Sequence, residues 1–212
     1  MAISSKKLAG LLLSAGSITG FLGIIIAETG YPNYSTANNF ISDLGIGPWA
    51  AIFNAALITG GLLGIIGVFF VSRWLKNRFF VVLLGLSALG SFLVGVFPED
   101  TGIPHIIAAL LAFIAGGLAA LTAYRHTQTP FRQVSLVLGA TALLAFTLLL
   151  TGVHLGLGAG GMERMVAYPN ILWSISFGGY LMADFENSRG VWKPIVFFSF
   201  QPLNVIDISW TI

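Results

Sequence analysis

The chain alternates long apolar runs with short polar segments. Six runs come close to the about 20 residues that an α-helix needs to cross the hydrocarbon core of a bilayer. They cover residues 8–27, 49–71, 79–97, 105–124, 134–154 and 170–183, and the last is the shortest. The pattern predicts an all-α membrane protein, a bundle of six transmembrane helices within residues 1–189. Residues 190–212, which contain two prolines, are predicted to form an interfacial or poorly ordered cytoplasmic tail.

Composition supports a membrane protein and excludes several other classes. Of the 212 residues, 56% are hydrophobic and 8% are charged, whereas about 25% are charged in soluble domains. The absence of cysteine excludes a disulfide-stabilised module and thiol catalysis. A net charge of +2 is too small for a nucleic-acid-binding surface. Membrane lipid is therefore the predicted partner, and the sequence does not indicate an oligomeric state.

The basic residues predict the orientation in the membrane. Nine of the ten lysines and arginines flank the same ends of the six runs, and Arg164 is the exception. The positive-inside rule makes that side cytoplasmic, so we expect a multi-pass protein of the cell membrane with both termini inside. A cleaved signal peptide is the alternative interpretation of residues 1–27, but the apolar run is too long for one. The side expected to face outward carries Glu28, Asp43, Glu99, Asp100 and Glu163.

Recurring small residues suggest an internal repeat. A proline precedes paired glycines in three of the runs, as in Pro48 with Gly60-Gly61, Pro104 with Gly116-Gly117 and Pro169 with Gly178-Gly179. This pattern favours three helical hairpins, although glycine is also common in membrane helices generally. Small residues four apart are expected at helix interfaces, at the pairs Gly16/Gly20, Gly60/Gly64, Ser91/Gly95 and Gly152/Gly156.

The first outward loop, residues 28–45, is longer than helix connections usually are. Thr36 and Gly45 are placed to begin and end a short helix, so we expect an interfacial helix over the mouth of the bundle. Its Ser42 and Asp43 would then point toward the bundle or into water. Asp43 is either a local cap or a carboxylate that acts as an acid, a base or a ligand.

Two histidines reach the same side. His105 begins the fourth run and His154 ends the fifth. Together with Asp43 and Asp100 they could form a carboxylate-and-imidazole set for zinc, the one cofactor considered, with Asp43, His105 and His154 as candidate metal ligands. The catalytic candidates are Ser42, Asp43, His105 and His154. The alternative is that both histidines bond to neighbouring loops, because their spacing matches no metal motif.

Arg164 is predicted on the outward side, where the positive-inside rule disfavours basic residues, and therefore needs an anion nearby. Either an acidic side chain, namely Glu163, Asp43 or Asp100, pairs with it, or an anionic ligand does. The predicted ligand-binding residues are Asp43, Asp100, Glu163, Arg164 and Tyr168. They predict a mouth that binds a polar or anionic small molecule or a lipid headgroup.

Three loop motifs carry a family resemblance. They are the stretch 41–45 (ISDLG), the stretch 95–98 (GVFP) with Asp100 and His105, and the stretch 161–164 (GMER) with Tyr168 and Pro169. Together these motifs resemble the archaeal and bacterial membrane family called domain of unknown function 998, over about residues 8–186. The resemblance implies a six-helix membrane protein and no established activity. The stretch after Arg189 departs from the short basic ending of that family.

A weaker likeness connects Ser42, Asp43, His105 and His154 to the alkaline ceramidases and adiponectin receptors, membrane hydrolases in which Ser, Asp and three His hold zinc. This chain lacks the third histidine and the seventh span. A metal-assisted lipid hydrolase is therefore the first alternative to the binding function. A purely structural bundle is the second.

Overall fold

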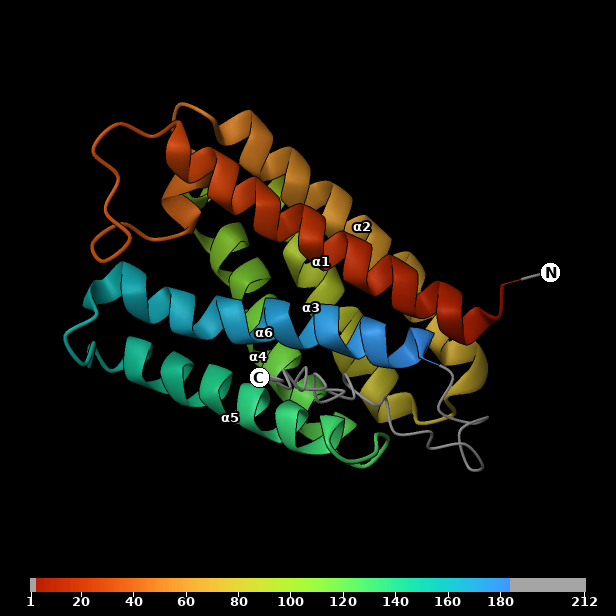
Figure 1. Ribbon diagram of the computed structural model, residues 1–212. Coiled ribbons are helices and arrows are strands. Elements are labelled where there is room, and N and C mark those ends of the chain that lie inside the picture. The colour runs from red at the N-terminus through yellow and green to blue at the C-terminus, as the bar shows by residue number, and fades with distance from the viewer. Residues whose placement is uncertain (1–2, 184–212) are drawn as a thin grey trace, which may run out of the picture.

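Helices make up all the regular structure that the computed structural model describes, which is residues 3–183 (Figure 1). The all-α prediction is confirmed for this part of the chain. The predicted tail at 190–212 lies outside the described residues. The elements are α1 (Ser5–Thr29), the 3₁₀ helix η1 (Ser42–Gly45), α2 (Ala50–Trp74), α3 (Arg78–Val96), the 3₁₀ helix η2 (Glu99–Thr101), α4 (Ile103–Ala123), α5 (Phe131–Leu150) and α6 (Gly158–Met182).

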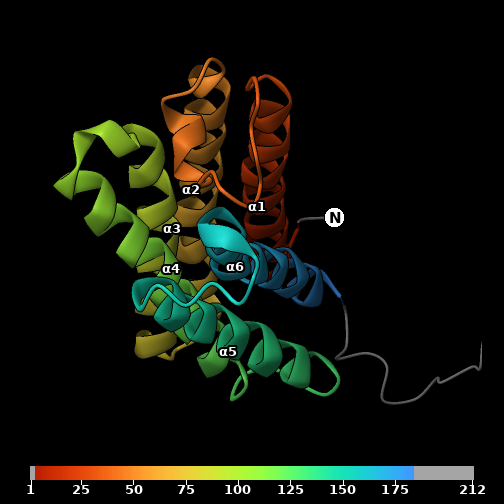
Figure 2. The same cartoon turned by 90° about the vertical axis from the view of Figure 1, so that its left-hand side faces the viewer.

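Five of the six long helices, α1 to α5, are long and apolar enough to cross a membrane. The sixth, α6, has 25 residues but carries a glutamate, an arginine and an asparagine among many small residues. It packs against α1, α4 and α5, and Figure 2 shows it between them. Since protein surrounds α6 on several sides, fewer of its side chains need to be compatible with lipid.

The boundaries of the last two helices differ from those predicted. The helix α6 begins at Gly158, twelve residues before the predicted start, and Pro169 lies inside it. Proline is typical of the first helical turn, but neighbouring helices allow it within a membrane helix. The fifth helix ends at Leu150, so His154 belongs to the loop 151–157 and does not end a helix.

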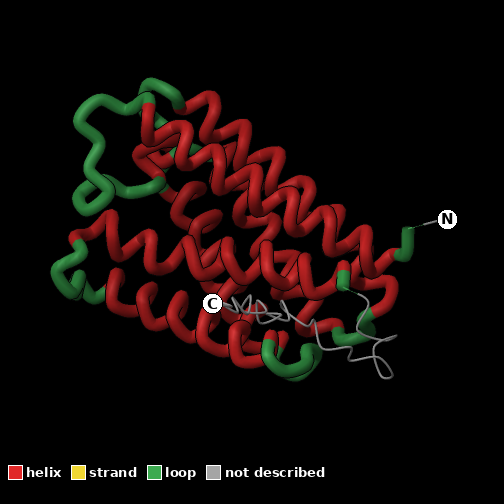
Figure 3. The backbone as a smooth tube through the Cα atoms, in the orientation of Figure 1, coloured by secondary structure: helices red, strands yellow, loops and turns green. Residues whose placement is uncertain are grey.

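Consecutive helices are neighbours throughout, and α6 returns to pack against α1. Each predicted hairpin pair is in contact, but α2 also packs on α3 and α4 on α5, so the six helices form a closed ring. The start of α1 and the end of α6 lie at the same end of the bundle, and the long loop between α1 and α2 lies at the other (Figures 1 and 3).

Small residues bring the helices into close contact, as predicted for most of the pairs. A Cβ atom added to Gly16 of α1 would lie 2.5 Å from the carbonyl oxygen of Gly60 of α2, and the reverse distance is also 2.5 Å. The prediction is wrong for Gly152 and Gly156, which lie in the loop 151–157 with open space around them. Both have a positive φ, so they serve the turn and not an interface.

Candidate functional site

One end of the bundle gathers the three loops 30–49, 97–102 and 151–157, together with five carboxylates and one arginine. We call it the acidic end. Contacts between η1 and η2 join the first two loops, and the amide of Gly160 donates to the carbonyl oxygen of Ala37 to join the first loop to α6. The acidic residues are Glu28, Asp43, Glu99, Asp100 and Glu163, and the basic residue is Arg164.

The first loop folds through side-chain bonds to its own backbone. The Asp43 carboxylate accepts from the Asn39 side chain at 2.9 Å and from the Phe40 amide at 3.0 Å. Such local bonds compete with helix formation. The predicted helix from Thr36 to Gly45 is therefore wrong before Ser42, and only η1 forms. Asp43 has the local structural role that was one of its two interpretations.

Arg164 holds this loop against the first turns of α6. Its Nη1 atom donates to three backbone carbonyl oxygens, those of Thr36 (2.9 Å), Asn39 (3.0 Å) and Gly160 (3.0 Å). Its Nη2 atom donates to the Glu28 carboxylate and to the Tyr34 hydroxyl, both at 2.6 Å. The prediction that Glu163, Asp43 or Asp100 pairs with Arg164 is wrong. Glu28, the last acid of α1, takes that place.

Tyr34 completes this arrangement. Burial raises the pKa of its hydroxyl to about 12, so the phenol keeps its proton at neutral pH. It can therefore accept from Arg164 and at the same time donate to the carbonyl oxygen of Phe40 at 2.8 Å. The guanidinium also lies 5.4 Å from the centre of the Tyr34 ring. Both terminal nitrogens of Arg164 are thus occupied by protein acceptors.

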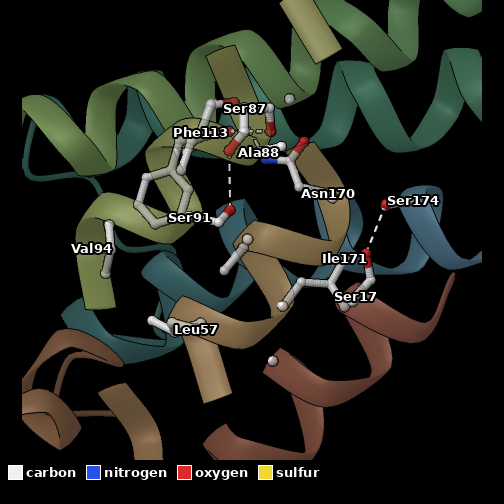
Figure 4. Close-up of a pocket in the computed structure, with 18 of the residues that line it drawn as sticks. Ser17, Leu57, Ser87, Ala88, Ser91, Val94, Phe113, Asn170, Ile171 and Ser174 are labelled. Atoms are coloured by element: carbon white, nitrogen blue, oxygen red, sulfur yellow. Dashed lines mark hydrogen bonds between the residues drawn. The ribbon is translucent and has the colours of Figure 1, made fainter. Parts of the chain in front are cut away.

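Below the loop lies a cavity of about 160 Å³ between α1, α2, α3, α4 and α6 (Figure 4). Its walls are mostly glycine, alanine and apolar side chains. Polar groups are few: Ser17 and Ser174 bond to each other at 2.7 Å, and the Ser87 hydroxyl donates to the carbonyl oxygen of Ala112 at 3.1 Å. Ile41, Ser42, His105 and Glu163 line it at the acidic end.

Glu163 is the charged side chain in the cavity wall. It is 7% exposed, and its carboxylate accepts a hydrogen bond from the backbone amide of Ile41. This bond ties the loop to α6 beside the Arg164 contacts. Glu163 therefore faces the cavity and also helps to hold its roof.

His105 enters the cavity from the first turn of α4. Its Nδ1 atom lies 2.8 Å from the carbonyl oxygen of Phe97, so Nδ1 carries a proton and donates it to that oxygen. Glu99 lies beside Ser42, Asp43 and His105 and interacts with all three.

The predicted candidates are only partly brought together. Ser42, His105 and Glu163 line the cavity, whereas Asp43 and Tyr168 are half-buried outside its lining and Asp100 is exposed. His154 lies in the loop 151–157 and lines no wall. Within residues 3–183, no three His, Asp or Glu side chains are grouped so that they could hold a metal ion. Zinc binding stays an untested prediction.

Sequence reasoning missed four residues that shape this end. Glu28 and Tyr34 bind Arg164, Glu99 contacts the Ser42-Asp43 pair, and Asn170 lines the cavity. The spacing of Glu163 and Asn170 could have revealed the last of these, because residues seven apart lie on one face of a helix. The other three depend on contacts between segments far apart in the sequence.

Glu99 leads to a prediction about pH. Burial raises the pKa of its carboxyl, and the nearby Asp43 carboxyl raises it further. In the unfolded chain the same group loses its proton near its ordinary pKa of about 4.3. Stability should therefore fall as the pH rises between the unfolded and the folded pKa, since the folded state binds more protons there. Thermal unfolding in detergent should show this fall in the wild type and a weaker one in Glu99→Gln.

The exposed neighbour provides the control for this prediction. Asp100→Asn also removes one negative charge from η2, but at an exposed position. It should keep the pH dependence of the wild type. If Glu99→Gln shows the same pH dependence as the wild type, Glu99 is not the group that causes it.

Comparison with known proteins adds the family. No curated protein and no solved structure matches the chain. A family model described as "Protein of unknown function (DUF998)" matches residues 14–179. The matched range begins within α1 and ends within α6, so it includes all three loops of the acidic end and every residue of the cavity lining except Leu13. Because it covers most of the 212 residues, the chain belongs to the DUF998 family, as its three loop motifs predicted.

Proposed function

We propose that this membrane protein binds a small molecule, or part of a lipid, in the cavity below the first loop. The observation that carries the proposal is the cavity itself, about 160 Å³ with apolar walls and with Ser42, His105 and Glu163 at one end. An apolar cavity of about 150 Å³ is large enough for a benzene molecule. A ligand with an apolar body and a polar head fits this distribution of wall residues.

The predicted anionic ligand loses its main support. It depended on a guanidinium free to bind an anion, and Arg164 donates instead to Glu28, Tyr34 and three backbone carbonyl oxygens. The proposed site therefore consists of the cavity wall, and Arg164 supports the loop that covers it.

Cavity filling tests the proposal. Ala109 of α4 lines the cavity, so Ala109→Leu should remove space for a ligand. We expect mass spectrometry of the purified protein to detect a co-purifying small molecule or lipid that the variant retains at about one tenth of the wild-type level. Ala55→Leu, at an exposed position of α2, is the matched control and should retain the ligand. Equal retention by both variants would refute binding in this cavity.

A hydrolase is the second candidate, and one observation favours it. Ser42 and His105 both line the cavity, and Glu99 interacts with both. A serine hydroxyl near an imidazole and a carboxylate is an arrangement suited to hydrolysis. Metal analysis distinguishes the metal-assisted form, which requires stoichiometric zinc that is lost in His105→Ala or His154→Ala.

We propose the orientation from the charge pattern: the acidic end faces outward and both termini face the cytoplasm. The chain contains no cysteine, so single introduced cysteines can be labelled without background. In intact cells, a membrane-impermeant thiol reagent should label Asp100→Cys and leave Lys76→Cys unlabelled. Both native residues are exposed and lie at opposite ends of α3 and its flanking loops. The reverse labelling would overturn the orientation.

A further inference from the structure

The cavity has no cationic side chain in its wall. Its charged group is Glu163, whose carboxylate is 7% exposed and accepts from the backbone amide of Ile41. Arg164 is next in sequence, but its ion pair is with Glu28. The Arg164 charge therefore acts on Glu163 without forming a salt bridge with it. A buried carboxylate that lacks a salt bridge is costly in a low-dielectric environment, and a bound cation reduces that cost. The charge on the wall therefore favours a positive ligand.

The wall also contains a buried polar atom without a hydrogen-bond partner, and this atom too favours a ligand with hydrogen-bond donors. The Asn170 side-chain nitrogen donates to the carbonyl oxygens of Phe113 (3.3 Å) and Val166 (3.1 Å), which fixes the orientation of the amide. Its Oδ1 atom is buried and has no hydrogen-bond partner. The Asn170 oxygen and the Glu163 carboxylate can both accept hydrogen bonds from a ligand.

Glu163 and Asn170 lie on one face of α6. They are seven residues apart, which is about two helical turns and about 10 Å along the axis. His105 lies at the same end of the cavity as Glu163. A ligand with its head at Glu163 therefore has His105 beside the head and Asn170 near the far end of its body.

We propose that the cavity takes a small organic amine, with a protonated amino group against Glu163 and an apolar body between the helices. This inference rests on the proposed binding function and specifies its ligand class. An ammonium group offers three donors and a positive charge, which match the Glu163 carboxylate. An anion would be repelled by the Glu163 carboxylate. A second donor at the far end of the ligand would meet Asn170.

Three probes of similar size and different charge test the proposal: phenethylamine, 2-phenylethanol and phenylacetate. Each is added to the purified wild-type protein in detergent, and the thermal midpoint is measured. We expect phenethylamine to raise the midpoint by about 2–4 °C at saturation. The alcohol should bind about tenfold more weakly. Phenylacetate should give no shift. A shift with phenylacetate at least as large as that with the amine would overturn the proposal without any variant.

Two variants locate the effect. Glu163→Gln keeps an oxygen that can accept from Ile41 but removes the charge, so it should abolish the preference for amine over alcohol. Ala109→Leu should abolish the shifts with both probes. If the alcohol binds and the amine does not, the proposed amine class is wrong, but the proposed binding of a ligand in the cavity is retained. If no probe shifts the midpoint, the amine proposal fails, and co-purification from Ala109→Leu decides the binding function independently.

The amine could be a free molecule or the headgroup of an ethanolamine lipid. Wild-type protein in nanodiscs of phosphatidylethanolamine and in nanodiscs of phosphatidylglycerol separates these sources. A headgroup already in the cavity should suppress the phenethylamine shift in the first discs only. Equal shifts in both discs would assign the site to a free amine.

Discussion

Replacing Arg164 by glutamine is expected to lower the free energy of unfolding by about 3–5 kcal/mol, the range for breaking a buried ion pair. The substitution leaves the Glu28 carboxylate without its cation and removes the donor to the carbonyl oxygens of Thr36 and Asn39. Arg164 is 7% exposed, so water replaces these bonds poorly. The thermal midpoint in detergent is the measurement.

Two further variants separate the role of Arg164 from a general effect of losing charge. Arg164→Lys should recover only part of the stability, because an ammonium cannot reach Glu28, Tyr34 and the loop carbonyls at once. Arg73→Gln removes an exposed arginine at the other end of α2 and should have little effect. An Arg164→Gln protein as stable as Arg73→Gln would contradict the role of Arg164 in holding the first loop against α6.

The second large effect is expected at Gly90 of α3. A Cβ atom there would lie 2.8 Å from the carbonyl oxygen of Ala108 and closer still to the amide nitrogen of Ala112, both in α4. Backbone atoms cannot rotate away, so the helices must separate. Gly90→Ala should cost about 3 kcal/mol, at the upper end of the range for overpacking. Thermal unfolding in detergent measures the cost.

Gly179 of α6 is the matched control, because a Cβ atom there meets nothing within 4 Å. Gly179→Ala should be neutral or stabilising by up to about 1 kcal/mol, since alanine favours helix more than glycine does. Equal destabilisation by the two substitutions would show that the α3 and α4 contact is not the cause.

The sequence predicts Ser42 and His105 as catalytic candidates and Glu163 as a ligand-binding residue at the mouth of the bundle, but it does not predict a cavity. All three line the cavity. The predicted ion-pair partner of Arg164 is wrong. Glu28 is 136 residues away in the chain, and its sequence surroundings do not distinguish it from Asp43 or Asp100 as a partner.

The sequence by itself determined the helical class, five helices that meet the requirements for a span, and the gathering of acids at one end. These features follow from local composition, because lipid demands apolar side chains and satisfied backbone bonds from each helix separately. The helix α6 does not meet this requirement for apolar side chains along its length. Protein covers it on several sides, so its first turns can be polar, and the sequence pattern there resembles a loop.

Only the tertiary structure decided which groups meet. The loop helix predicted from Thr36 to Gly45 does not form before Ser42. Besides the local bonds of Asp43, Arg164 of α6 binds the carbonyl oxygens of Thr36 and Asn39 that a helix would have used. The cavity likewise arises where five helices with small residues converge without filling the space between them. Contacts of this kind depend on distances between segments far apart in the chain, and a local hydrophobic pattern carries no information about those distances.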